Sequence, residues 1–340
     1  MYDFSKEIFK FHDQHITLTR GQQNDMRSRR EANLKRIKAG LEELGKPSVA
    51  ETINQGGYAQ KTMTQPPEAN EDSRYDIDMG VVFDKDDSVG PKSTRRWVRD
   101  AIARKAVNMK NDPELKKKCV RVVYANGYQC DFPVFRRELS GQSFSYEIST
   151  GEEWEKSDPR AINKWFEDEI SNKSPDNGGR YQLRRIARML KYFCKVHAHR
   201  RNRKFPAGLV ATALAVEAYK AEDGRDDLSF RETLRYLSTR SEHNPVFANG
   251  LIISDEKDAD RIRRLADEAR EVVEHLDGLN GNATESDARR AWRKVFRHSF
   301  FDETVSSELA SLTAAERAER MQASVNARQT DGNAGRPWCH

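Results

Sequence analysis

The sequence predicts an α+β protein in two parts, a strand-rich part over residues 46–155 and a helical part over residues 156–312. The first part contains several short runs rich in β-branched and aromatic residues, which is typical of strands. Two of these runs flank Asn126-Gly127, the strongest two-residue signal for a β-hairpin. The second part has the apolar spacing of amphipathic helices instead. The change of pattern places the boundary near residues 150–157.

The composition bounds the class of protein. The chain has 340 residues, of which 36% are hydrophobic and 33% are charged, enough for a sizeable core. No apolar run approaches the ~18–20 residues of a membrane helix, and the N-terminus lacks the pattern of a signal peptide. The four cysteines form no metal-binding spacing, so we expect reduced thiols and a cytoplasmic protein. The net charge of +5 suits an anionic ligand but is weak for a nucleic-acid-binding protein.

Residues 1–45 are expected to form an N-terminal helix that packs across both later parts. Apolar side chains recur at spacings of three, four and three and give one stripe, made by Leu34, Ile37, Leu41 and Leu44. Gly45 and Pro47 then end the helix. Its basic residues could also contact RNA, but they encircle the helix and acidic residues lie among them.

A glycine pair follows the first short strand, which is expected over residues 48–54. Gly56 and Gly57 stand between that strand and a short helix. Glycines at such a place let backbone amides approach a ligand closely, and amides at a helix N-terminus bind phosphate groups well. A plain turn is the alternative that this pair alone leaves open.

The strand at residues 75–83 carries two acidic side chains. Because side chains alternate along a strand, Asp76 and Asp78 share one face, about 6.5–7 Å apart. Two like charges beside core residues favour a divalent cation, and Mg²⁺ takes carboxylate and phosphate oxygens. Gly80 is next on that face and is expected to leave room for a ligand. The alternative is an edge strand with a solvated acidic face.

A third acidic side chain, Asp131, lies in the last strand of the hairpin. We expect a helix over residues 92–109, followed by strands at 118–125 and 128–135. Asp131 faces oppositely to its apolar neighbours in the second of these strands. A lone acid within a strand usually lies on a solvated face, and here it also supplies a possible third carboxylate.

The helical part begins at Ser157-Asp158-Pro159, where a polar N-cap precedes a proline in the first turn, after a further strand expected at 144–148. Its strongest helix covers residues 181–199, and the basic residues expected on its outer faces are Arg184, Arg185, Arg188, Lys191 and Lys195. His197 and His199 are expected on the surface, since helix residues two apart do not face one ligand. Further helices are expected over 207–220, 230–240, 255–276 and 285–298, before a flexible tail over 313–340.

The order of these motifs resembles one known group of enzymes. Gln55-Gly56-Gly57-Tyr58, followed by Tyr75-Asp76-Ile77-Asp78, fits the pattern Gln-Gly-Ser…Asp-Ile-Asp of the bacterial CD-NTases. Residues 127–134, with Asp131, resemble the third-carboxylate strand of that group. Residues 183–193 resemble its Leu-x-x-Leu-Leu-Lys-x-Trp helix, whose lysine meets nucleotide phosphates. Over roughly residues 50–220 the chain is thus similar to polymerase-β-like nucleotidyltransferases, and within them to the CD-NTases, relatives of oligoadenylate synthase and cyclic GMP-AMP synthase.

The resemblance implies a bilobed fold, in which a polymerase-β-like core of mixed sheet and flanking helices lies beside a C-terminal helical bundle. It implies an Mg²⁺-dependent nucleotidyltransferase that makes a cyclic di- or trinucleotide second messenger from ATP and other nucleoside triphosphates. In this family the product activates a downstream effector in anti-phage (CBASS) defence. A regulatory protein is a possible further partner, whereas neither a membrane nor nucleic acid as the main substrate is expected.

The resemblance also implies roles for single residues. The catalytic residues Asp76, Asp78 and Asp131 would hold two Mg²⁺ ions, with Mn²⁺ as an alternative. The nucleotide would be bound by Gln55, Gly56, Gly57, Lys61, Thr62, Lys191 and Lys195. The chain departs from the family pattern at Gly57, which replaces a loop serine, and at Ala207, which replaces a serine that often opens the next helix. Each change removes a hydroxyl that would contact phosphate.

Two other functions remain open at this stage. The same core in other enzymes adds nucleotides to RNA ends or to a protein hydroxyl, but an enzyme directed at RNA should have a stronger basic channel than +5 supplies. The chain could also be a module that only senses nucleotide or RNA. The three carboxylates argue against that function, because a pure binder can lose them without cost.

Overall fold

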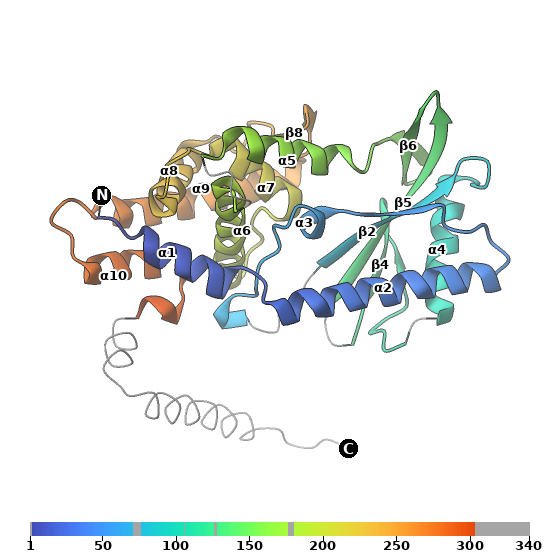
Figure 1. Cartoon of the computed structure of the whole chain (residues 1–340), viewed down its shortest axis with the longest axis horizontal. Coiled ribbons are helices and arrows are strands. Elements are labelled where there is room, and N and C mark those ends of the chain that lie inside the picture. Colours follow the sequence, from blue (N-terminus) through green and yellow to red (C-terminus); the bar gives the residue numbers. More distant parts are fainter. Residues whose placement is uncertain (1, 71–75, 106, 126–127, 176–179, 303–340) are drawn as a thin grey trace, which may run out of the picture.

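The protein consists of a sheet part and a helical part that lie side by side (Figure 1). The mixed sheet with flanking helices and the separate group of C-terminal helices confirm the predicted α+β class. None of the helices in the described ranges combines the length and hydropathy needed to cross a membrane. The computed structural model describes residues 2–70, 76–105, 107–125, 128–175 and 180–302, without the side chains of Asn70 and Asp76.

The sheet is mixed, and its central pair of strands is parallel. In spatial order its strands are β1 (Glu51–Asn54), β2 (Asp76–Asp84), β5 (Gln129–Ser140), β4 (Cys119–Val123) and β3 (Glu114–Leu115). Strands β2 and β5 run parallel, and the other neighbours are antiparallel. Two further strands, β6 (Ser143–Thr150) and β7 (Glu153–Lys156), extend the sheet from β5, and β7 was not predicted. The predicted Asn126-Gly127 turn lies outside the described residues.

Two helices cover one face of the sheet. They are α2 (Arg20–Glu43) and α4 (Pro91–Lys105), and they pack on each other and on the apolar side chains of β2, β4 and β5. The two helix backbones approach closely at Gly40, where an added Cβ would overlap the carbonyl of Ala101. This buried face leaves the opposite face of β2 and β5 for polar side chains.

The N-terminal segment is not the single helix that the sequence predicts. It forms α1 (Ser5–Phe11), a π-helical turn η1 (His12–Ile16) and then α2. The break has two causes. Thr19 caps α2 in a capping box with Gln22, and Thr17 forms an isolated β-bridge with Thr64, far away in sequence. Because α1 packs in the helical part and α2 in the sheet part, the segment crosses both (Figure 1).

Helix α6 is the centre of the helical part (Figure 1). Around it lie helices that the sequence predicts to within a few residues, and a small hairpin that it does not predict. The helices are α5 (Ala161–Lys173), α6 (Gln182–Arg201), α7 (Gly208–Ala218), α8 (Asp226–Thr239), α9 (Glu256–Asp277) and α10 (Glu285–Phe296), and the hairpin is β8 (Phe247–Ala248) with β9 (Leu251–Ile252). The tail predicted over 313–340 lies outside the described residues.

Several polar side chains of α6 are buried although the sequence predicts them on outer faces. His197 is fully buried, between the carbonyl of Val295 at 3.0 Å and the carboxylate of Glu268 at 2.8 Å. Arg184 and Arg185 are also buried. The expectation for these residues was wrong because helices from other parts of the chain pack over the faces of α6 that carry them. His199 is exposed, as predicted.

Candidate active site

Two of the three predicted carboxylates meet on neighbouring strands. Asp78 on β2 and Asp131 on β5 are direct partners in the parallel register, so their Cα atoms are about 4.8 Å apart. Both lie on the face opposite to the apolar core under α2 and α4. Asp76 is the first residue of β2, opposite Gln129, and its side chain is not described. The register of β2 and β5 therefore brings together acidic residues 53 positions apart in sequence.

The glycine pair lies directly against one of these carboxylates. It opens the short helix α3 (Gly56–Ala59), and Gln55 at its N-cap donates its backbone N–H to the carbonyl of Asp78 at 3.2 Å. Gly56 has a φ of +59°, and an added Cβ would overlap Asp78 Oδ2. Only glycine fits this position without displacing the carboxylate. The glycine loop and the face of β2 that carries Asp78 thus form one continuous surface.

A lysine of the helical part reaches the same loop. Lys191 of α6 donates from Nζ to Thr62 Oγ1 at 2.9 Å, and an added Cβ on Gly57 would lie 3.1 Å from this Nζ. Burial, together with the charge of the neighbouring Lys195, lowers the pKa of Lys191 to about 7, and Asp78 opposes the shift. Lys195 Nζ lies 3.4 Å from the carbonyl of Thr64. An anion at the loop would stabilise the protonated form of Lys191.

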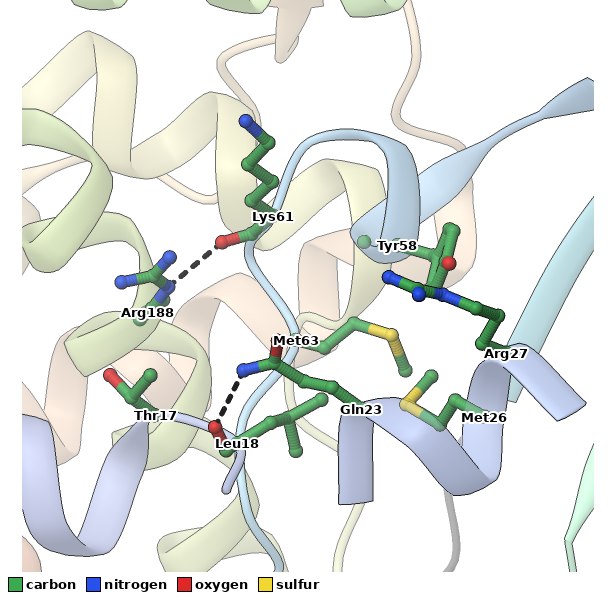
Figure 2. A pocket seen from close by; sticks show the side chains of 10 residues that line it. Thr17, Leu18, Gln23, Met26, Arg27, Tyr58, Lys61, Met63 and Arg188 are labelled. Atoms are coloured by element: carbon green, nitrogen blue, oxygen red, sulfur yellow. Dashed lines mark hydrogen bonds between the residues drawn. The ribbon is translucent and has the colours of Figure 1, made fainter. Parts of the chain in front are cut away.

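The remaining predicted nucleotide ligands take different positions. Thr62 is fully buried, and its hydroxyl already accepts the hydrogen bond from Lys191. Thr62 therefore positions the lysine and is not itself exposed to a ligand. Lys61 is exposed and has a φ of +55°, while its carbonyl accepts a hydrogen bond from Arg188 Nε at 2.8 Å. A cavity of about 320 Å³ lies beside these residues, between the start of α2, α3 and α6 (Figure 2). The sequence did not indicate this cavity.

The sequence analysis missed Arg121, which faces Asp131 across β4 and β5. The guanidinium donates two hydrogen bonds to the carboxylate, from Nε at 2.8 Å and from Nη2 at 2.7 Å. The only available signal was the hairpin itself. A two-residue turn at Asn126-Gly127 would place Val122 opposite Asp131, whereas the observed register leaves three residues between Tyr124 and Tyr128.

The space predicted beside Gly80 is filled. An added Cβ at Gly80 would lie 3.2 Å from the ring of Phe135. Phe135 belongs to a small apolar cluster on the same face of the sheet, together with Ile53 and Val82. The prediction of a ligand next to Gly80 was therefore wrong, and the acidic surface ends at Asp78.

The donor set suits a hard divalent cation. Asp78 and Asp131 offer carboxylate oxygens on one face, and Mg²⁺ and Mn²⁺ prefer such ligands. Because Gly56 has no side chain, the glycine loop leaves the carboxylate of Asp78 uncovered. Among the described side chains no three His, Cys, Asp or Glu residues surround one point, and that of Asp76 is not included in this set. The carboxylates of Asp78 and Asp131 can thus provide two of the ligands that a metal ion would need.

Comparisons with known proteins agree with this geometry. Residues 50–135 match the family model of the cyclic GMP-AMP synthase DncV-like nucleotidyltransferase domain. A cyclic GMP-AMP synthase of Escherichia albertii is 28% identical over 218 residues, which are 61% of this chain and 46% of that protein. The chain thus spans about half the length of this curated relative.

Solved structures are similar over most of the chain. The Vibrio cholerae DncV cyclic AMP-GMP synthase in complex with nonhydrolyzable GTP has a TM-score of 0.67 at 14% identity, covering 87% of this chain and 96% of that one. The structure of DncV with the linear intermediate 5′ pppA(3′,5′)pG gives the same values. At this identity the likeness shows a common fold. Residues 50–135, which carry the glycine loop and all three acidic positions, are thus similar in sequence to the nucleotidyltransferase domain of the DncV-like cyclic GMP-AMP synthases.

Proposed function

We propose that the protein is a metal-dependent nucleotidyltransferase that joins nucleoside triphosphates into a cyclic di- or trinucleotide. One observation carries the proposal: Asp78 and Asp131 are in register on parallel strands, with the glycine loop against Asp78. The relatives are named for such products, cyclic GMP-AMP and cyclic AMP-GMP. Activation of a downstream effector by the product, in defence against phage, extends the same proposal.

The residues of the glycine loop and α6 would hold the donor triphosphate. The backbone N–H groups at Gly56 and Gly57 would donate to its phosphate oxygens, because they lie at a helix N-terminus without side chains in the way. Lys191 would supply a point charge next to Gly57, and Lys61 and Lys195 would add positive potential on either side. Gln55 would fix the loop through its hydrogen bond to the backbone of Asp78.

The three acidic residues would bind the metal and orient the acceptor. Two Mg²⁺ ions at Asp76, Asp78 and Asp131, or Mn²⁺ in their place, would supply charge neutralisation for the triphosphate and lower the pKa of the attacking hydroxyl. Asp131 would hold the acceptor ribose hydroxyl and take its proton on a carboxylate oxygen. The oxygen then attacks the α-phosphorus, the bond to the β-phosphate breaks, and pyrophosphate leaves. A second transfer on the linear product closes the ring.

The test compares two aspartates of one strand. Asp78 and Asp84 stand on the same face of β2, and Asp84 pairs with Arg137 at 2.7 Å, away from the loop. Purified wild type, Asp78→Asn and Asp84→Asn are each incubated with the four ribonucleoside triphosphates and Mg²⁺, treated with phosphatase and examined by mass spectrometry. We expect a phosphatase-resistant cyclic product from wild type and Asp84→Asn, and at least ~100-fold less from Asp78→Asn.

Other outcomes would redirect the proposal. Full activity of Asp78→Asn would exclude this carboxylate as a metal ligand. Nucleotide binding without turnover in the wild type would favour a sensing module instead. A product that grows only on added RNA or protein would favour transfer to those acceptors.

A further inference from the structure

A second cavity, of about 410 Å³, adjoins the glycine loop and is lined mainly by basic side chains. It lies between the N-terminal segment and the first turns of α6. Its basic lining consists of His12, Lys61, Arg180, Arg184, Arg185 and Arg188. Neither the sequence analysis nor the proposed reaction uses this cavity.

Most of these cations have a carboxylate partner. Arg185 donates twice to Asp226, at 2.5 and 2.9 Å, and Arg184 donates to Glu167 at 2.6 Å. These ion pairs neutralise the charges of Arg184 and Arg185 in the lining of the cavity, and they explain why both arginines are buried. One further carboxylate, that of Asp13, lines the cavity and lies between His12 and Arg180. Its oxygens lie 3.0 Å from His12 and 3.8 Å from Arg180.

Arg188 differs from its neighbours. Nε donates to the carbonyl of Lys61 at 2.8 Å, and Nη1 lies 3.5 Å from Nε2 of His12, whose pKa burial lowers, so that this contact is to a neutral imidazole and not to an anion. Within the described ranges no carboxylate bonds to this guanidinium. Burial lowers the pKa of Arg188 to about 10, and Arg184 and Arg185 lower it as well, against an opposing effect of Asp13. Arg188 is half-buried, and a guanidinium held among other cations is destabilised unless an anion pairs with it.

A purely structural role accounts for only part of this arrangement. Arg95, which is buried, shows what such a role requires: it donates to Ser149 Oγ and to the carbonyl of Gly151, two neutral oxygens. Arg188 has one such oxygen, and it borders both this cavity and the one shown in Figure 2. Its outer nitrogens are therefore placed to meet a ligand.

We propose that this cavity binds a phosphate-bearing anion, with Arg188 as the principal ligand and Arg180 at its rim. The site is distinct from the donor site at Gly56 and Gly57, and it does not depend on the proposed reaction. Arg188 holds the carbonyl of Lys61, and Lys191, on the next turn of α6, holds the hydroxyl of Thr62. An anion bound to Arg188 would therefore lie close to Lys61, the residue before Thr62, whose hydroxyl accepts the hydrogen bond from Lys191.

The test measures binding without metal or turnover. Sodium pyrophosphate is titrated into the full-length chain in EDTA by calorimetry, with sodium chloride at equal ionic strength as the reference. We expect at least about tenfold weaker binding to Arg188→Gln than to the wild type, whereas Lys191→Met should lose only the pyrophosphate that binds at the donor site. Arg263→Gln makes the same charge change at an exposed position of α9 and should bind like the wild type.

Two further measurements make the result decisive. Thermal unfolding in chloride shows whether Arg188→Gln is folded, and Arg188→Lys keeps the charge and should regain part of the affinity. Competition with ATP shows which phosphate compound the cavity takes. If ATP displaces pyrophosphate from the cavity, the site binds the phosphate groups of a nucleotide. If both bind at once, the site takes free phosphate or pyrophosphate. Equal affinity of wild type and Arg188→Gln, or loss only in Lys191→Met, would overturn the proposal. Neither result would bear on catalysis by Asp78.

Discussion

Arg121 and Asp131 face each other across β4 and β5, and two hydrogen bonds of 2.8 and 2.7 Å join the guanidinium to the carboxylate. A charge-assisted pair of this geometry is among the stronger side-chain interactions. A divalent cation at Asp131 must therefore share or displace a bound arginine. We therefore expect the pair to oppose metal binding at Asp131.

The first prediction is that Arg121→Gln strengthens metal binding. Removal of the competing cation should lower the Mn²⁺ concentration for half-saturation by about 3- to 10-fold, measured by electron paramagnetic resonance of free Mn²⁺. Arg136→Gln is the matched control, since Arg136 also pairs with an acid directly opposite on an antiparallel neighbour, Glu147 at 2.6 Å. Unchanged or weaker Mn²⁺ binding in Arg121→Gln would show that the pair does not oppose the metal.

The second prediction concerns two glycines with the same backbone conformation. Gly56 and Gly45 both have a φ of +59°, but an added Cβ overlaps Asp78 at the first and meets open space at the second. Alanine should cost each about 1–2 kcal/mol of unfolding free energy, measured in urea, because an L residue is strained there. Only Gly56→Ala should also lose nucleotidyl transfer, by about 100-fold or more. Equal activity of the two variants would mean that the loop can move away from Asp78.

The third prediction is a pH dependence set by Lys191. Its pKa near 7 in the free protein should rise when phosphate binds beside it. Below pH 7 the lysine is already protonated, so the affinity for metal-free ATP should be flat. Above pH 7 binding must take up a proton, and the affinity should fall by up to about tenfold per pH unit. Lys191→Met should bind more weakly and lose this slope. The same slope in both proteins would assign it to another group.

The fourth prediction compares two glycines of α2. Glycine to alanine in an exposed helix normally gains up to about 1 kcal/mol, and Gly21→Ala, near the start of α2 with open space around it, should be neutral or stabilising. Gly40→Ala should instead destabilise the protein by about 1–3 kcal/mol, because its Cβ would overlap the backbone of Ala101 on α4. Urea denaturation measures both. A neutral Gly40→Ala would mean that the two helices can shift apart at little cost.

The parts of the fold that the sequence predicted depend on local patterns. The alternation of side chains along β2 is a property of residues two apart, and it identified Asp78 before any partner strand was known. The same holds for the start of α9, where Asp255 caps the helix close to the predicted position. The family resemblance then supplied what no local pattern contains, namely the proposed role of Lys191 in phosphate binding.

The predictions that failed depend on contacts between distant segments. The break before α2 arises because Thr17 pairs with Thr64, and His197 is buried because α9 and α10 pack over α6. Phe135 fills the space at Gly80 only because β5 lies parallel to β2. Arg121 was missed through a shift of one residue in the hairpin register. Each failed prediction depended on which segments of the chain lie next to each other. The spacing of residues within one helix or strand does not contain that information.

The N-terminal segment has a mechanical consequence. The chain passes between the two parts of the molecule at α5, and a second time between α1 and α2. Phe4 donates its N–H to Asp227 at 3.0 Å on one side, and Gly40 lies against Ala101 on the other. A body held at one pivot can twist and swing in any direction, whereas two separate pivots leave a single axis of rotation. Any relative movement of Lys191 and the glycine loop, which come from opposite parts, is therefore expected to be restricted to rotation about that axis.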